Sequence, residues 1–335
     1  MCVIASSTAL TRLSEWSRLK LANLPTPIRP LARLAEALGR PELDLLVKLD
    51  SETGFGLGGN KVRKLEFELA PDRLEDITCL ITAGGPQSNH CRVTAAAAAR
   101  LGLRCALIVN GPEPETPTGN ALLHRLFGAE IVTVLERQDR STQLQSTAVD
   151  IEMEGGHPLV IPIGASTGLG SLGYAAASIE LFKQLANQKP LPERTVVFVA
   201  SSSCGTLAGL LLGISLLKMT NVLLVGVSAD MSALEIEEHT QQIAHEGANL
   251  LGWDGALLTD SVKAIDDQVG DGYGLSTESS DEALRMFALY EGLVLDPTYT
   301  AKAAAGLISW IRTGMASDLD RMVFLHTGGH PGLLT

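Results

Sequence analysis

The chain has 335 residues, enough to bury a sizeable core and to form two domains rather than one. Apolar residues make up 45% of it and charged residues 19%, which is the composition of an ordered globular protein. The formal charge of −12 argues against a nucleic-acid partner, because a surface without a broad basic patch cannot release counterions from phosphates.

Apolar strands and helices alternate along the chain. Near-continuous apolar runs bounded by polar turns are typical of strands that are buried on both faces. We expect strands at 43–50, 77–83, 104–111, 129–136, 158–164, 195–200, 221–229 and 321–329, and helices at 91–102, 119–128, 174–186 and 207–219. This order predicts an α/β fold with open, twisted, parallel-rich sheets that carry helices on both faces. Ligands of such folds bind beyond the carboxyl ends of the strands, so the loops there are the places to search.

The five cysteines lie far apart, with no CxxC pair and an odd count. Reduced thiols therefore fit better than a disulfide framework or a metal site. The first residues lack the charged and apolar regions of a signal peptide, and the longest apolar run, 207–217, is far too short to cross a bilayer. We expect a cytoplasmic protein with no membrane partner and no metal.

Two segments match the G-x-G-x-x-G pattern of dinucleotide-binding proteins, at 54–59 and 168–173. The second follows an expected strand and precedes an expected helix. A dinucleotide site also needs an acidic residue at the end of the next strand, to hold the ribose hydroxyls. That strand ends in Ser201 and Ser202 instead, so we do not expect a nicotinamide or flavin nucleotide.

Three polar turns follow expected strands, at 82–92, 200–209 and 327–329. Hydroxyl groups and the backbone N–H groups of a helix N-terminus together form an anion site. The first two turns taken singly also fit a simple helix cap, with Ser88 or Thr206 as the capping residue. Three such turns at three strand ends favour one shared site over independent caps.

A basic segment, "GFGLGGNKVRKLEF", covers residues 54–67. Lys61 and Lys64 share one helical face, whereas Arg63 points roughly 160° away from Lys61. A lysine beside an anion pocket, with glycines that allow close approach, fits an amine that forms a Schiff base with a phosphorylated carbonyl cofactor. A solvated basic turn fits as well, and spacing alone leaves open which lysine would be the reactive one.

Six motifs, taken in order, carry a resemblance to a known family. They are "GGNKVRKLEF", "QSNHCR", "IPIGAS", "GDGYGLSTE", "LDPTYTAKAAAGLI" and "HTGG". Over about residues 24–334 the chain resembles the D-cysteine desulfhydrase and 1-aminocyclopropane-1-carboxylate (ACC) deaminase family, which includes L-cysteate sulfo-lyase. These are fold-type-II enzymes, similar to the tryptophan synthase β subunit, that use pyridoxal 5′-phosphate (PLP). The resemblance implies a homodimer of two-domain subunits, with a small domain at 54–165 and a large PLP-binding domain formed by 1–53 and 166–335.

The resemblance also implies which residues bind the cofactor. The lysine after "GGN" forms the Schiff base, which selects Lys61, and Lys64 on the same face is then a phosphate contact. Asn89 is expected to hydrogen-bond the ring oxygen, and Thr327 to face the pyridine nitrogen. The phosphate itself is assigned to Ser202, Ser203, Gly205 and Thr206.

For the reaction, the resemblance implies β-elimination from a β-substituted amino acid. D-cysteine would give pyruvate, sulfide and ammonia, and L-cysteate would give sulfite in place of sulfide. Ser88 is expected to contact the substrate carboxylate and to relay a proton. The implied catalytic residues are Lys61, Ser88, Tyr273 and Tyr299, and the implied substrate-binding residues are Ser88, Asn89, His90, Tyr273 and Tyr299.

Several positions depart from the family pattern, among them 48–51 and Pro86. Thr300 occupies the place of a glutamate that, in ACC deaminases, keeps the pyridinium protonated, and its presence favours elimination over ring opening. The loop with Cys204 contains less glycine than is usual, and His330 follows "HTGG". The alternatives are an ACC deaminase that forms 2-oxobutyrate and ammonia, a β-replacement enzyme, and a PLP-binding protein without catalysis.

Overall fold

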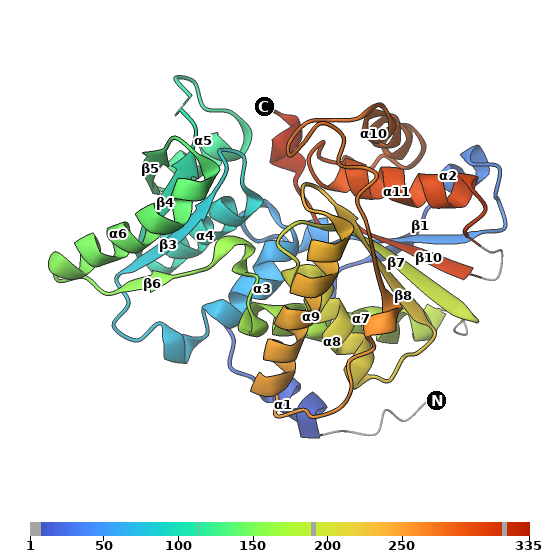
Figure 1. Ribbon diagram of the computed structural model, residues 1–335, viewed down its shortest axis with the longest axis horizontal. Helices are drawn as coiled ribbons and strands as arrows, with labels where there is room; N and C mark the ends of the chain where they lie inside the picture. Colours follow the sequence, from blue (N-terminus) through green and yellow to red (C-terminus); the bar gives the residue numbers. More distant parts are fainter. Residues whose placement is uncertain (1–7, 113, 189–191, 317–319) are drawn as a thin grey trace.

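The computed structural model describes residues 8–112, 114–188, 192–316 and 320–335, which form two sheets covered by helices (Figure 1). The larger sheet has the strand order β1 (Ile28–Pro30), β2 (Asp44–Lys48), β10 (Asp320–Leu325), β7 (Arg194–Ser201), β8 (Val222–Ser228) and β9 (Val262–Ile265). Its strands are parallel except that β1 is antiparallel to β2. The smaller sheet, β5 (Glu130–Val134), β4 (Arg104–Asn110), β3 (Cys79–Gly84) and β6 (Pro158–Val160), is parallel throughout. The predicted α/β class is confirmed.

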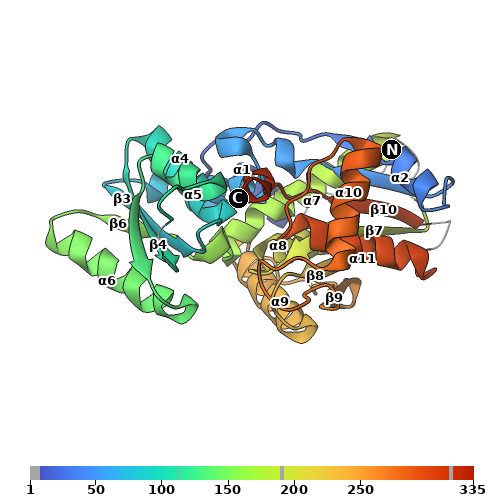
Figure 2. The ribbon, with the colours of Figure 1, turned by 90° about the horizontal axis from the view of Figure 1, so that it is seen from above.

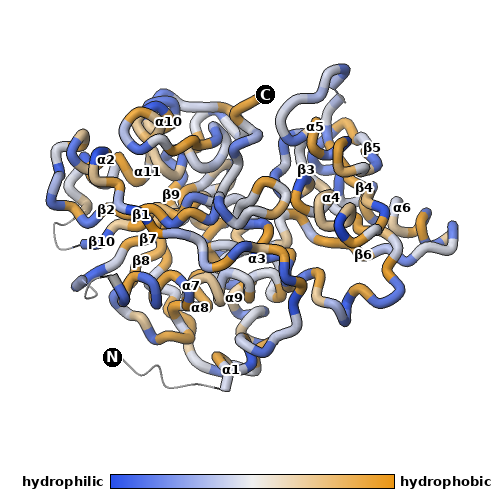
Figure 3. The backbone as a smooth tube through the Cα atoms, turned by 180° about the vertical axis from the view of Figure 1, so that it is seen from behind, coloured by the Kyte–Doolittle hydropathy of each residue, from blue (hydrophilic) through white to orange (hydrophobic). Residues whose placement is uncertain are grey.

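Helices pack on both faces of the larger sheet because its strands are apolar on both sides. In β7, Val197 and Val199 belong to the core beneath α7, α8 and α9, whereas Val196 and Phe198 belong to the core beneath α10 and α11. Figure 3 shows hydrophobic residues along the strands of both sheets. The helices of the described residues are α1 (Thr8–Glu15), α2 (Ala32–Ala37), α3 (Asn60–Glu68), α4 (Asn89–Leu101), α5 (Gly119–Leu126), α6 (Arg140–Met153), α7 (Gly168–Gln188), α8 (Gly205–Leu216), α9 (Ala233–Leu250), α10 (Glu278–Glu291) and α11 (Thr300–Arg312).

The two sheets lie side by side, the smaller one with α4, α5 and α6 on the left in Figures 1 and 2. All four strands of the smaller sheet fall within 54–165, and all six strands of the larger sheet fall outside it. The domain boundaries themselves stay a prediction. In the part of the chain that the structure describes, no helix is long and apolar enough to span a membrane.

Helix α8 is buried at every position and crosses α7 closely. A Cβ atom at Gly209 would clash with Tyr174, and one at Gly213 would clash with Ser178. Glycine at these two positions therefore lets α7 and α8 approach closely.

The expected strands and helices are all present, and most of their ends differ by a few residues. Two predictions were wrong in a way that matters for the site. The last strand ends at Leu325 rather than 329, and Gly328 and Gly329, which were expected in it, adopt φ values of 96° and 101° that no strand has. The 168–173 motif lies inside α7 rather than before a helix, so it forms no loop.

Candidate active site

A cavity of about 500 Å³ lies at the carboxyl ends of β3, β7 and β10, where the three polar turns meet. The strand ends of both sheets contribute to it, as expected for a ligand site of this fold class. The predicted site residues that line this cavity are Lys61, Ser88, Asn89, His90, Ser202, Ser203, Thr206, Tyr273, Tyr299 and Thr327. Lys64 and Gly205 lie directly behind the wall.

The glycine-rich turn positions Lys61 at the start of α3. Gly58 and Gly59 adopt φ values of 71° and 110°, and a Cβ atom at Gly59 would lie 2.9 Å from the carbonyl oxygen of Thr327. Asn60 donates its backbone N–H to the same carbonyl at 2.9 Å and its side-chain amide to Thr206 Oγ1 at 2.9 Å. The first turn of α3 is thus held between the β7–α8 and β10 turns, with Lys61 in the cavity wall.

Two amines lie close together at this point, Lys61 half-buried in the cavity wall and Lys64 fully buried behind it. Burial lowers the pKa of Lys61 to about 8, although a hydrogen bond with Lys64 opposes the shift. Burial, followed by the charge of Lys61, lowers the pKa of Lys64 well below the usual lysine value. Lys64 Nζ donates to Ser166 Oγ at 3.1 Å, and Ser166 Oγ donates to Ser203 Oγ at 2.8 Å. Lys64 therefore reaches the β7–α8 turn through Ser166, and a bound anion there would restore its charge.

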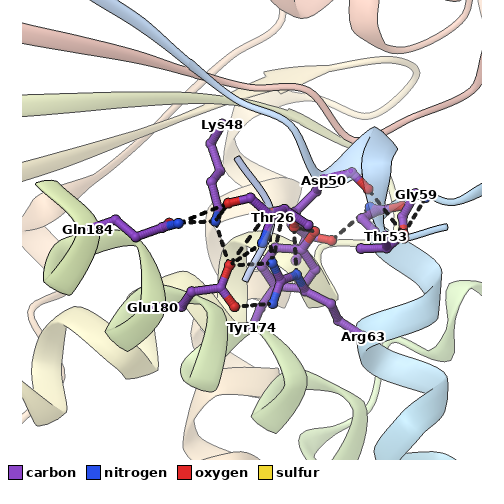
Figure 4. Close-up of polar contacts among 11 residues, drawn as sticks. Thr26, Lys48, Asp50, Thr53, Gly59, Arg63, Tyr174, Glu180 and Gln184 are labelled. Carbon is purple, nitrogen blue, oxygen red and sulfur yellow. Dashed lines mark hydrogen bonds and ion pairs between the residues drawn. The ribbon is translucent and has the colours of Figure 1, made fainter. Parts of the chain in front are cut away.

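Arg63 extends from the other side of α3 into a buried ionic cluster (Figure 4). Its Nε lies 2.8 Å from Asp50 Oδ2, and its Nη2 lies 2.8 Å from Glu180 Oε1. Tyr174 donates its hydroxyl to Asp50 at 2.6 Å, and Lys48 Nζ lies 2.5 Å from Glu180. The cluster links α3 to β2 and α7, so it anchors the helix that carries Lys61.

The β7–α8 turn has the form of an anion site. Cys204 adopts φ 61°, and the N-terminus of α8 follows at Gly205. A Cβ atom at Gly205 would lie 2.7 Å from Ser166 Oγ, so only glycine fits there. Ser203 and Thr206 flank the backbone N–H groups at the N-terminus of α8, and both residues line the cavity. Such a group of donors at a helix N-terminus attracts phosphate.

The β3–α4 turn presents Ser88, Asn89 and His90 to the cavity. Ser88 is also the cap of α4, since its Oγ accepts the N–H of Cys91 at 3.2 Å. The hydroxyl of Thr82 donates its proton to the carbonyl oxygen of Ile161. Its oxygen lies 2.8 Å from His90 Nε2 and can only accept there, so Nε2 is the ring nitrogen that carries the proton. Nδ1 of His90 is then an acceptor, and it is buried without a partner among the described residues. Burial lowers the pKa of His90 well below its usual value, which keeps the ring neutral.

Tyr273 and Tyr299 close another side of the cavity, and their hydroxyls are hydrogen-bonded to each other. Asp296 accepts the backbone N–H groups of Thr298 and Tyr299 at 3.1 and 2.9 Å, which holds the Tyr299 turn in place. Burial raises the pKa of Tyr299 well above the usual value, so the hydroxyl stays protonated. Thr300 donates its hydroxyl to Asp296 at 2.6 Å and does not line the cavity.

Several lining residues were missed by the sequence analysis. Asn60 and Asp296 lie inside the motifs "GGNK" and "LDPTY", so closer reading of those motifs could have found them. Arg137 and Arg140 come from a segment that matches no motif, and only the fold brings them to the cavity. Arg137 Nη2 lies 2.6 Å from Asp230 Oδ2 and its guanidinium carbon lies 5.2 Å from the centre of the Tyr273 ring.

Comparison with known proteins agrees with this geometry. The family described as "Pyridoxal-phosphate dependent enzyme" matches residues 19–328. The chain belongs to this family. D-cysteine desulfhydrase of Salmonella choleraesuis (strain SC-B67) is 40% identical over 329 residues, with 97% of each chain covered. The protein of the same name from Salmonella paratyphi C (strain RKS4594) is 39% identical over the same length, again with 97% of each chain covered.

Solved structures of similar proteins share the fold of this chain. The structure described as an ACC deaminase homologue has a TM-score of 0.87 and 32% identity, with 98% of this chain and 97% of that chain covered. Threonine deaminase isoform 2 from Solanum lycopersicum has a TM-score of 0.63 at 15% identity, with 96% of this chain and 82% of that chain covered, which shows a shared fold.

The residues around the cavity fit PLP, the cofactor of the family. The cofactor has an aldehyde, an anionic phosphate and a polar pyridine ring. The cavity offers a half-buried amine of lowered pKa in Lys61 and an anion site at the β7–α8 turn. No group of three or more His, Cys, Asp or Glu residues that could hold a metal ion occurs among the described residues.

Proposed function

We propose that this protein is a PLP-dependent carbon–sulfur lyase that removes the β-substituent of an amino acid. D-cysteine is the leading substrate, which would give pyruvate, sulfide and ammonia. The observation that carries this proposal is the position of Lys61, a half-buried amine of lowered pKa in a cavity that also holds an anion site. The 40% identity to D-cysteine desulfhydrase over nearly the whole chain supports the same substrate class.

Lys61 is the residue that bonds the cofactor covalently. Ser202, Ser203, Gly205 and Thr206 hold its phosphate, and Lys64 adds a positive charge through Ser166. Asn89 hydrogen-bonds the ring oxygen, and Thr327 faces the pyridine nitrogen. Bound PLP supplies an electron sink for the electron pair that remains when the substrate loses its Cα proton.

Once the substrate amine has displaced it from the cofactor, the freed amine of Lys61 would also be the base for the reaction. Its pKa of about 8 leaves a useful fraction of neutral amine near neutral pH, and this amine takes the Cα proton. Ser88, Asn89 and His90 bind the substrate at the β3–α4 turn, and Ser88 relays a proton. Tyr273 and Tyr299 are protonated donors beside the leaving group. The Cβ–S bond breaks with its electron pair on sulfur, and one water molecule hydrolyses the released enamine to pyruvate and ammonia.

The structural neighbour described as an ACC deaminase homologue keeps ring opening as the second candidate. Thr300 counts against it, since it is a hydroxyl outside the cavity rather than a carboxylate at the cofactor. We further propose a cytoplasmic homodimer of two-domain subunits. The four cysteines that the structure describes as free thiols support a reducing compartment.

The proposal is tested by incubating the PLP-loaded protein with D-cysteine, L-cysteate and ACC in parallel. The expected result is sulfide and pyruvate from D-cysteine. Sulfite from L-cysteate would keep the reaction class with another substrate. Formation of 2-oxobutyrate from ACC alone would overturn the lyase proposal in favour of ring opening, and no keto acid from any of them would overturn catalysis.

A further inference from the structure

The side-chain oxygen of Asn89 accepts two hydrogen bonds from behind the cavity wall. Arg92 Nη1 donates to Asn89 Oδ1 at 2.8 Å, and Asn120 Nδ2 donates to the same oxygen at 2.9 Å. Arg92 and Asn120 are fully buried, whereas Asn89 lines the cavity. The side-chain nitrogen of Asn89 forms no hydrogen bond with any residue that the structure describes. It is therefore the end of this amide that is left for a ligand.

The neighbours of Asn89 also decide which end of its amide is the oxygen. An arginine guanidinium has only N–H donors, so the atom that it meets must be an acceptor. Asn120 is oriented in turn, because its Oδ1 accepts from Arg92 Nη1 at 2.9 Å and its Nδ2 donates to the carbonyl oxygen of Gln87 at 2.8 Å. Asn120 thus also presents a donor to Asn89. Both neighbours require the same orientation, in which Asn89 offers the cavity an N–H donor.

Arg92 also joins Asn89 to the turn that carries Lys61. Its Nη2 donates at 2.7 Å to the carbonyl oxygen of Gly58, three residues before Lys61. Within the described part of the chain its guanidinium pairs with no carboxylate, and its Nε is buried without a partner. Burial lowers the pKa of Arg92 to about 10 in spite of the charge of Asp296, so the group is still a cation near neutral pH. A buried cation held by neutral oxygens is unfavourable, which points to a role beyond packing.

We propose that Arg92 is a positioning residue that, with Asn120, turns the Asn89 amide so that the site takes the ring hydroxyl of the cofactor as its anion. This inference rests on the proposed contact between Asn89 and the ring oxygen. An N–H donor stabilises a charged oxygen more than a hydroxyl, and the cation behind Asn89 polarises the amide and strengthens the bond. PLP carries its hydroxyl and its aldehyde on neighbouring ring atoms. By holding both Asn89 and the Lys61 turn, Arg92 places the two groups that meet these atoms.

A binding experiment tests this without turnover. The probe is 4-deoxypyridoxine 5′-phosphate, which carries the phosphate and the ring hydroxyl but no aldehyde, so it cannot bond to a lysine. It is added to K61M, which lacks the amine of Lys61 and its charge, at the pH at which half of the free probe is ionised at the hydroxyl. Ultraviolet absorption gives the ratio of ionised to neutral hydroxyl. This ratio should be at least roughly tenfold higher for the bound probe than for the free probe, as expected for a charged hydrogen bond.

Further variants in the K61M background assign the effect to Arg92. R92M should return the ratio to within about twofold of that of the free probe, and R92K should keep part of the increase. N120A should lose part of it, and this variant keeps Arg92 should R92M fail to fold. The matched control is R321M, because Arg321 is similarly buried but pairs with Asp44 at the end of β10 that lies away from the cavity. R321M should leave the ratio unchanged.

A last variant separates positioning from a direct effect of charge. If Arg92 acts through Asn89, N89A should remove the increase as fully as R92M, and combining the two should remove no more. An N89A variant that keeps the increase would overturn the proposal. So would a probe that does not bind, a ratio that binding does not raise, or one that R92M and N120A leave unchanged. A protein that forms no keto acid from any amino acid would refute the lyase function alone, since the probe reports the ring oxygen without turnover.

Discussion

Lys61 and Arg63 extend from opposite sides of the first turns of α3, and of the two only Lys61 lines the active-site cavity. Arg63 is bonded to Asp50 and Glu180 in the buried cluster. The helix thus presents a reactive amine on one face and is anchored by ion pairs on the other. The cluster fixes where Lys61 can lie. The two faces of α3 can be tested separately, one by its effect on stability and the other by the titration of Lys61.

Loss of the ion pairs on the anchoring face of α3 should destabilise the protein strongly. Replacing Arg63 by Met should lower the free energy of unfolding by about 3–5 kcal/mol, because Asp50 would be left buried without its cation. Urea unfolding of the cofactor-free protein measures this. Arg312, which pairs with Glu282 at the surface, provides the matched control, and R312M should cost less than about 1 kcal/mol. Similar losses for the two variants would contradict the anchoring role of Arg63.

The amine of Lys61, on the reactive face of α3, should titrate at a lower pH than an ordinary lysine. Burial disfavours the ammonium form of Lys61, so its amine should lose a proton with a midpoint at about pH 8 rather than near the ordinary lysine value. The fraction that reacts with acetic anhydride in the cofactor-free protein should therefore rise as pH increases through about 8. Mass spectrometry of the Lys61 peptide, with Nα-acetyl-lysine as the external reference, gives the curve. A midpoint that coincides with that of the reference would contradict the shift.

Lys64 should affect binding of the phosphate rather than formation of the covalent bond. K64M removes the charge that reaches the β7–α8 turn through Ser166, so the dissociation constant of PLP should rise by roughly tenfold or more. Pyridoxal, which lacks the phosphate, should bind the variant and the unmodified protein alike. A variant that loses affinity equally for both compounds would show that Lys64 has no specific role toward the phosphate.

The hydrogen-bonded tyrosines should act as a unit. Y299F removes a hydroxyl in the cavity wall whose raised pKa keeps it protonated, and kcat should fall by roughly 100-fold or more if this hydroxyl donates a proton to the leaving group. Because Tyr273 shares the bond, Y273F should cost less in the Y299F background than it does alone. Strictly additive losses in the double variant would mean that the two hydroxyls act independently.

The sequence was most informative where short motifs sit at strand ends. Ser88 and Thr206 follow apolar strands, so a ligand site at each of these turns could be predicted, but β3 and β7 belong to different sheets, and only the placement of the two sheets brings the turns together. The 3.6-residue period placed Lys61 and Lys64 on one face and Arg63 on the other, as the structure has them.

Other parts depended on three-dimensional placement. The helices at 140–153, 233–250, 278–291 and 300–312 and the short strands at 28–30 and 262–265 were not expected. Strands of three or four residues carry too little pattern to recognise, and their position comes from pairing with β2 and β8. Arg140 begins one of the missed helices, and nothing in its local sequence separates it from a surface arginine.

The central claim is that Lys61 is the amine that bonds the cofactor. The most direct test is borohydride reduction of the PLP-loaded protein, followed by digestion and mass spectrometry of the peptides. The account predicts that the visible absorption of the bound cofactor disappears and that the pyridoxyl group is found on Lys61, with none on Lys64. A pyridoxyl group on Lys64 or on another lysine, or a protein that stays colourless after incubation with PLP, would contradict it.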